Sequence, residues 1–333
     1  MLEVISTSGF SSFQDMGRNG FRSQGISRSG AADYYALFEG AALLDQNPNS
    51  TALELIGNGG KFRVLQGCMV ALTGAIMPAS LDQKPLAWNS SHFLHDGSIL
   101  ELGAPQNGRY SYLHLRGGFK APKIFNSSSA QPSAGIGKYT RPKDILEQLE
   151  KVPEALNCLT IEPVDRFEST TFRLVESFQT HLFTPKTIKK FVDTEFSIDN
   201  QTNRGGMKLA HTGSGFSTSN QLKIMSDMII PGDIQMTGSG QPFVLLPDCQ
   251  TMGGYPRIGC IIPPDLPAIA QLKTGRTIKF KFISRDEANR IASKDLKCLE
   301  IIKERCLEPI RDPQKMADLL NFNLIDGAVW AKN

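Results

Sequence analysis

The sequence predicts a mainly β protein with two β-domains, few short helices and a helical C-terminal tail. Three observations support this fold class. Short apolar or alternating runs recur between Gly, Pro, Asn and Asp residues, which is typical of strands joined by close turns. Helical periodicity is rare before residue 284, and the 333 residues are enough for two domains of ordinary size. Together they favour barrels or sandwiches over a doubly wound parallel sheet.

The predicted strands are short segments rich in branched and aromatic side chains. They lie at 61–65, 68–72, 98–102, 109–115, 160–161, 171–175, 243–246, 259–262 and 277–282. The stretch 126–143 is rich in Ser, Gly and Pro, and we expect it to separate two β-domains, at 1–143 and 144–284. A second polar stretch, 200–220, is expected to be a mobile or ligand-facing loop.

Helices are predicted at 31–44, 188–191, 285–307 and 313–320. The first is expected to open at Ser29, and the last at an Asp312 N-cap. The clearest signal is a capping box, in which the Ser284 oxygen accepts from the Glu287 amide and the Glu287 side chain reaches back. We therefore expect a helical tail over 285–333.

Composition narrows the class of protein. Hydrophobic residues make up 40% and charged residues 21%, and a net charge of +3 gives no argument for a nucleic-acid or membrane partner. No long apolar run and no signal-like N-terminus occur. The six cysteines lack a CxxC pair and the five histidines lack metal-ligand spacing. These features predict a cytoplasmic protein without a metal site of its own.

The most informative segment is the apolar run 243–246 with the polar loop that follows it. A core strand gives rigidity and its loop gives polar groups, which is a common way to build a binding site. Asp248 can act as an acid or base or position a water, although such side chains also bond loop backbone near turns. The candidate residues of this region are Gln235, Gln241, Asp248, Gln250, Thr251, Gly253, Gly254 and Tyr255. Cys249 is interpreted as a buried structural thiol, because no base is evident beside it.

Two further polar clusters are candidates. Near the N-terminus, Gln14, Asp15, Arg18 and Asp33 are interspersed with glycines, and Arg18 can bind a carboxylate or phosphate in a fork. The equally supported alternative is that Asp15 and Arg18 pair and fix a turn. In the middle of the chain, Asn203 and Arg204 precede a Gly pair that can hold an anion, with an ordinary solvated loop as the alternative.

These motifs, taken in order, resemble the allophanate hydrolase subunit 2 family, which includes the C subunit of bacterial 5-oxoprolinase (KipA or PxpC). The resemblance runs over roughly 1–290 and rests on several motifs, among them GFSSFQDMGRNG at 9–20, SGAAD at 29–33, NRGGMKL at 203–209, PGDIQ at 231–235 and DCQTMGGYP at 248–256. The chain departs from the family pattern at Glu39–Gly40, where an Ala–Asn pair is usual, and at Cys249, where Arg is usual. It also departs in the 126–144 region.

The resemblance implies two cyclophilin-like β-barrel domains and two partners, a KipI-like B subunit and a LamB/YcsF-like A subunit. Such proteins together convert 5-oxo-L-proline to L-glutamate with ATP hydrolysis. ATP, with its Mg²⁺, is then bound by this chain or elsewhere in the complex. Catalytic roles are expected for Asp15, Arg18, Asp248, Gln250 and Thr251. Substrate binding is expected for Gln14, Asp33, Asn203, Arg204, Gln235, Gln241, Gly253, Gly254 and Tyr255.

Two alternatives stay open from the sequence. The chain can be a carboxyltransferase-type subunit that acts on urea or a related amide, with biotin supplied by another protein, because no biotinyl Met-Lys-Met motif occurs. It can also be a non-enzymatic regulator that binds a KipI-like kinase inhibitor.

Overall fold

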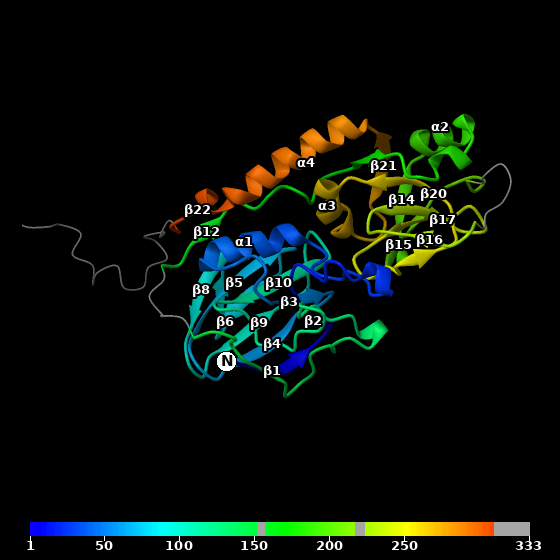
Figure 1. The fold of residues 1–333 in the computed structure, drawn as a ribbon. Coiled ribbons are helices and arrows are strands. Elements are labelled where there is room, and N and C mark those ends of the chain that lie inside the picture. The colour runs from blue at the N-terminus through cyan, green and yellow to red at the C-terminus, as the bar shows by residue number, and fades with distance from the viewer. Residues whose placement is uncertain (152–156, 217–223, 310–333) are drawn as a thin grey trace, which may run out of the picture.

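The computed structural model describes residues 1–151, 157–216 and 224–309. The protein is mainly β, with 34% strand and 19% helix, which confirms the predicted fold class. The first half forms two sheets, the second half forms a closed barrel beside them, and a long helix extends over both (Figure 1).

The N-terminal half is built from two antiparallel sheets. One has the order β11 (Ile145–Leu146), β1 (Leu2–Thr7), β4 (Gly60–Val64), β9 (Ile99–Leu102), β6 (Ala79–Leu81) and β7 (Lys84–Leu86). The other has the order β2 (Phe10–Gln14), β3 (Ala52–Ile56), β10 (Tyr110–Leu115), β5 (Cys68–Gly74), β8 (Ser90–Leu94), β12 (Thr160–Ile161) and β22 (Cys306–Leu307). Alternate side chains of both sheets, such as Phe62, Val70 and Leu113, form one core between them.

The C-terminal half contains the closed barrel. Its strands run in the order β13 (Thr171–Val175), β20 (Arg257–Ile261), β17 (Asp233–Met236), β18 (Pro242–Leu245), β15 (Gly206–Ala210), β14 (Phe196–Thr202) and β21 (Thr277–Phe282). Phenylalanines fill the interior, and Phe191 of α2 (Pro185–Asp193) stacks on Phe280. Outside the barrel, β16 (Asp227–Met228) and β19 (Met252–Gly253) form a two-stranded ribbon.

The helices lie close to their predicted positions, but their first and last residues differ from the prediction. The predicted start of the first helix at Ser29 is wrong: α1 (Tyr34–Leu44) begins behind Asp33, whose carboxylate accepts from the Ala36 amide. Ser29 has a φ of 52° and so lies outside helical geometry. The proline-rich segment at 263–267 forms η4 (Pro263–Asp265), which leads into α3 (Leu266–Ala270). Short 3-10 turns occur at η1 (Arg22–Gln24), η2 (Pro132–Ala134) and η3 (Thr180–Leu182).

The tail begins as predicted and ends earlier. In α4 (Arg285–Glu300) the Ser284 side chain accepts from the Glu287 amide at 3.1 Å, which confirms the N-cap. The helix does not continue to 307, because η5 (Ile302–Arg305) follows and β22 then pairs with β12 of the N-terminal half. The predicted helix at 313–320 lies outside the described residues.

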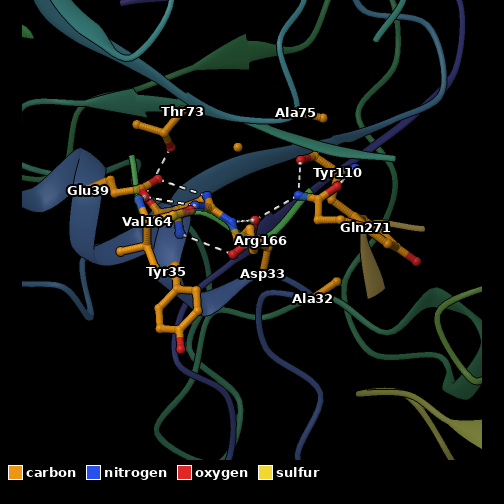
Figure 2. Close-up of polar contacts among 12 residues, drawn as sticks. Ala32, Asp33, Tyr35, Glu39, Thr73, Ala75, Tyr110, Val164, Arg166 and Gln271 are labelled. Atoms are coloured by element: carbon orange, nitrogen blue, oxygen red, sulfur yellow. Dashed lines mark hydrogen bonds and ion pairs between the residues drawn. The ribbon is translucent and has the colours of Figure 1, made fainter. Parts of the chain in front are cut away.

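A buried ionic cluster joins the two halves. Arg166, in the connection between them, donates to Asp33 at 2.6 Å and to both oxygens of Glu39 at 2.8 Å. Gln271, which follows α3, donates to the same Asp33 at 2.7 Å (Figure 2). All four side chains are 2% exposed or less, so these contacts hold α1 of the first half against the barrel side of the molecule.

Candidate functional site

A cleft of about 1350 Å³ opens between loops of the N-terminal half and one side of the barrel. Its lining comes from segments 25–27, 131–136, 200–206 and 248–255, together with barrel strands. Eight of the predicted site residues line it: Asn203, Gln235, Asp248, Gln250, Thr251, Gly253, Gly254 and Tyr255. The cleft is therefore the candidate site. The predicted loop over 200–220 is wrong for much of its length, because 200–202 belong to β14 and 206–210 to β15. The turn between these strands lines the cleft, and 217–220 lie outside the described residues.

The loop 248–255 has the rigid support that its sequence predicts. Strand β18, at the predicted run 243–246, is paired on both sides inside the barrel, with β15 and with β17. The loop then pairs through β19 with β16. At Gly253 a β-carbon would stand 2.5 Å from Nε2 of Gln235, so a larger residue here would displace the Gln235 amide.

Gln235 brings an unpaired hydrogen-bond donor to the cleft wall. Its side chain is 9% exposed, and its Nε2 is buried without a hydrogen-bond partner in the described part of the chain. Leaving a buried donor unsatisfied costs about 1–3 kcal/mol, so a ligand oxygen that accepts from it is favoured. A carbonyl or carboxylate oxygen fits this position.

Arg204 and Asp248 form a buried pair beside the cleft. Arg204 Nε and Nη2 donate to the two Asp248 oxygens at 2.8 and 2.9 Å, and Nη1 donates to Glu54. Ser29 Oγ donates to the same Asp248 at 2.6 Å, and Nη2 also reaches the Gly30 carbonyl. Burial alone would lower the pKa of Arg204, but the Glu54 and Asp248 charges raise it well above its ordinary value.

This pairing changes the interpretation of both residues. The solvated-loop alternative for the Arg204 segment is wrong, because Arg204 is 6% exposed and its charge is compensated by two carboxylates. Both oxygens of Asp248 already accept hydrogen bonds, which suits a positioning role. Through these contacts Asp248 holds the loop 248–255 in place. Its catalytic role stays a prediction.

Asp15 lies away from the cleft and is fully hydrogen-bonded. Its carboxylate accepts from Gly17 N, Ser127 Oγ, Ser128 N, Ser128 Oγ and Ser129 Oγ, at 2.6–3.0 Å. Burial raises the pKa of Asp15, but these hydrogen bonds outweigh it and the pKa lies below its usual value. An ionised carboxylate with this set of donors fixes the 127–129 turn, and the geometry favours a structural role.

Arg18 also contacts the segment 124–129. Its Nε donates to the Ile124 carbonyl at 3.2 Å, and its Nη2 donates to the Ser129 carbonyl. Within the described residues no ion pair joins Arg18 to Asp15, so the alternative in which the two fix a turn by pairing is wrong. Arg18 does not line the cleft.

Three other predicted residues are used inside the fold. Gln14 donates to the Ala130 carbonyl at 2.9 Å, Asp33 caps α1, and Gln241 donates to the Leu209 carbonyl. None of the three lines the cleft. Their substrate-binding role stays a prediction that the geometry does not favour.

The sequence missed one wall of the cleft. Ser27 Oγ donates to Gln131 Oε1 at 2.5 Å, and Gln131 Nε2 donates to the Asp248 carbonyl at 3.2 Å. Both side chains line the cleft and tie the N-terminal loops to the barrel loop. Gln131 lies in the stretch predicted to be a linker, and its only signal was the Ser- and Gly-rich composition shared by linkers and ligand loops.

Cys249 lines the cleft with a neutral thiol. It is 3% exposed, and burial raises its pKa to about 11. A thiol with that pKa is a weak nucleophile at neutral pH. This agrees with the prediction of a structural cysteine.

Metal-ligand clusters and membrane-spanning helices are two further kinds of feature that bear on function. The described residues contain no group of three or more His, Cys, Asp or Glu side chains that could hold a metal ion. None of the helices in residues 1–151, 157–216 and 224–309 is long and apolar enough to cross a membrane.

Comparison with known proteins identifies the family of the chain. Residues 24–282 match the family described as carboxyltransferase domain, subdomain A and B. The chain belongs to this family. It is also 31% identical to proteins named as the C subunit of 5-oxoprolinase from Haemophilus influenzae (298 residues; 89% of this chain, 95% of the relative) and Escherichia coli (293 residues; 86% and 93%).

Among solved structures, the fold is similar to a Kluyveromyces lactis urea amidolyase. The TM-score is 0.81 over 94% of this chain at 21% identity. The chain spans only 21% of that enzyme, so the likeness concerns the fold of one part. The family that the sequence motifs indicated is thereby confirmed.

Proposed function

We propose that this chain is the C subunit of an ATP-dependent 5-oxoprolinase. Together with a KipI-like B subunit and a LamB/YcsF-like A subunit it opens the lactam of 5-oxo-L-proline to L-glutamate. The observation that carries the proposal is the 31% identity over 95% of a protein named as the C subunit of 5-oxoprolinase. We place the complex in the cytoplasm, where the six free cysteines stay reduced.

The cleft offers groups that suit a lactam. The substrate has a carbonyl oxygen and a carboxylate, which are acceptors for the unpaired Gln235 Nε2. Gln250 and Thr251 line the same wall and provide an amide and a hydroxyl. Asp248, held by Arg204, keeps this loop in place. In this proposal Gln235, Gln250 and Thr251 contact the substrate.

The reaction needs activation because a lactam is a stable amide. The lactam oxygen takes the γ-phosphoryl group of ATP, and ADP leaves. Water then adds to the activated carbon, and the ring C–N bond breaks with a proton passing from the added water to nitrogen, which leaves a γ-glutamyl phosphate. A second water molecule hydrolyses this acyl phosphate to glutamate and phosphate. Donors aimed at the reacting oxygen stabilise the charge that develops on it. ATP is a substrate of the complex, and its site is either on this chain or on a partner.

Reconstitution tests the proposal. The chain mixed with its A and B partners should release ADP and glutamate from 5-oxo-L-proline in equal amounts. Gln235→Ala should raise the KM for 5-oxo-L-proline about ten- to a hundredfold, as expected for loss of a buried hydrogen bond. Gln241→Ala is the matched control, because its amide is used inside the barrel and does not line the cleft. Absence of glutamate from the full set of proteins rejects the proposal.

A carboxyltransferase function is the second candidate, since the matched family carries that name. A biotin carrier would then come from another protein and the acceptor would be urea or a related amide. Avidin separates the two functions. It should leave glutamate release from 5-oxo-L-proline unchanged and should abolish a biotin-dependent carboxyl transfer.

A further inference from the structure

The four most buried arginines of the described chain differ in how their charges are compensated. Arg18, Arg166, Arg204 and Arg257 are each 6% exposed or less. Arg166, Arg204 and Arg257 each form ion pairs with two carboxylates. Arg18, at 1% exposure, bonds only to two backbone carbonyls. A buried cation without a paired counter-charge is unfavourable by several kcal/mol, on the order of the cost of an unpaired ion.

The guanidinium of Arg18 has one nitrogen left over. Nε and Nη2 are used by the Ile124 and Ser129 carbonyls, whereas Nη1 is buried without a hydrogen-bond partner in the described residues. Burial lowers the pKa of Arg18, and the charges of Asp15 and Asp248 offset that effect only in part. Nη1 carries two N–H groups. A ligand that brings a negative oxygen to it satisfies both the missing hydrogen bond and the missing charge.

Arg18 lines a cavity of about 310 Å³ that is separate from the cleft. That volume is at the lower end of the roughly 300–1,000 Å³ typical of small-molecule sites. Most of the lining is apolar, and it includes Phe13, Ala121, Pro122, Ala130, Ile145 and Leu146. The other polar groups of the lining are engaged: Lys138 pairs with Asp144 at 3.1 Å, and Thr140 bonds Ser11. Ser128 and Ser129 bond Asp15. Among the lining groups, Arg18 thus contributes a buried donor atom without a hydrogen-bond partner in the described residues.

The cavity and the cleft share a wall. Ile136 lines both, and the turn from Gln131 to Ile136, closed by two backbone hydrogen bonds, lies between them. Gln131 on the cleft side contacts the Asp248 carbonyl. A molecule in the cavity would therefore lie directly behind one side of the cleft without entering it.

We propose that this cavity binds a small organic monocarboxylate, with its carboxylate on Nη1 of Arg18 and its apolar body against the surrounding side chains. The apolar lining disfavours inorganic phosphate or a dicarboxylate, because further charges would be desolvated without partners. The site is independent of the reaction proposed for the cleft, and its test does not require that reaction.

Calorimetric titration of the purified full chain with sodium hexanoate tests the site, with hexanamide as the uncharged match. Hexanoate should bind at least about tenfold more tightly than hexanamide, the difference expected for a charge-assisted hydrogen bond. Arg18→Met should reduce hexanoate binding by about the same factor or more. Since that variant also removes donors from two carbonyls, Ala121→Phe is the second variant: it keeps Arg18, fills the cavity from a half-exposed position and should abolish binding.

Lys138→Met is the matched control. Its side chain is 71% exposed and already paired, so its loss should change hexanoate binding by no more than about twofold. Three results overturn the proposal: hexanoate that binds Arg18→Met or Ala121→Phe as it binds the wild type, absence of binding to the wild type, or loss of binding in Lys138→Met alone. Competition between hexanoate and 5-oxo-L-proline for one site would also overturn it, because it would place both ligands in the same space.

Discussion

Removal of Arg166 tests the ionic cluster that joins the two halves. The side chain is 1% exposed and lies between Asp33 and Glu39, both 0% exposed, so Arg166→Met leaves two carboxylates without their cation (Figure 2). Breaking a buried pair by removing one partner costs about 3–5 kcal/mol. With two orphaned carboxylates we expect the upper end, about 5 kcal/mol, in the free energy of unfolding measured by urea titration followed by circular dichroism.

The pH dependence of that loss has a definite sign. Burial raises the pKa of Glu39 above its usual 4.5, even though the Arg166 charge opposes the shift. A carboxyl whose pKa is higher in the folded state stabilises folding below the unfolded pKa, and that contribution is lost as pH rises through the folded pKa. Without Arg166 the shift grows, so the variant should lose more stability at pH 8 than at pH 5.

Arg63→Met is the matched control for this experiment. Its pair with Glu3 has a similar distance, 3.0 Å, but the side chains are 50% and 25% exposed, so its loss should cost about 1 kcal/mol or less. A cost for Arg166→Met no larger than that of the control, or one that is the same at pH 5 and pH 8, would refute the reasoning from buried charge.

Three other predictions follow from single contacts. Gly40→Ala should lower the free energy of unfolding, measured by urea titration, by about 1–2 kcal/mol despite a gain in helix propensity, because the new β-carbon would overlap the buried His114 ring. Unchanged stability would contradict this. Gly253→Ala should displace the Gln235 amide and raise the KM for 5-oxo-L-proline in the reconstituted complex while stability stays close to wild type; an unaltered KM would argue against contact between Gln235 and substrate. Iodoacetamide at pH 7.5 should label the exposed Cys158 and Cys298, which peptide mass spectrometry can show. It should leave Cys249 unmodified, since burial raises the pKa of that thiol to about 11, and rapid labelling of Cys249 would show that it is a reactive thiolate.

Local patterns predicted the parts of the fold and site that depend on local interactions. The run 243–246 and the polar loop behind it became strand β18 and one wall of the cleft, and Ser284 caps α4. Both depend on contacts within a few residues. The predicted helix start at Ser29 is wrong because the Ser29 hydroxyl bonds Asp248, 219 residues away, and no local pattern indicates that contact.

Long-range pairing is what the sequence could not predict. Arg18 and Arg204 both lie in glycine-containing motifs and both were expected to hold an anion. Arg204 meets Glu54, 150 residues earlier, and is neutralised, whereas Arg18 meets only carbonyls. Nothing in either motif distinguishes these outcomes, because the partner carboxylates come from other strands and loops. Arg166, in the polar connection between the halves, gave no signal for the same reason.

The departures from the family pattern can be separated by what they contact. Glu39 is paired with Arg166 and Gly40 leaves room for His114, so both changes are accommodated by buried contacts, and neither residue lines the cleft. Cys249 differs, because it lines the cleft at a position where the sequence resemblance implies arginine. An arginine does lie beside it: Arg22 interacts with the Cys249 thiol and donates to the Ile229 carbonyl. The 126–144 region also lines the cleft, through Gln131, Ser133, Ala134 and Ile136. Among the single positions 39, 40 and 249, only 249 alters the surface of the cleft, so the comparison of Cys249→Arg with the wild type in the reconstituted complex bears on substrate choice, whereas changes at 39 and 40 bear on stability.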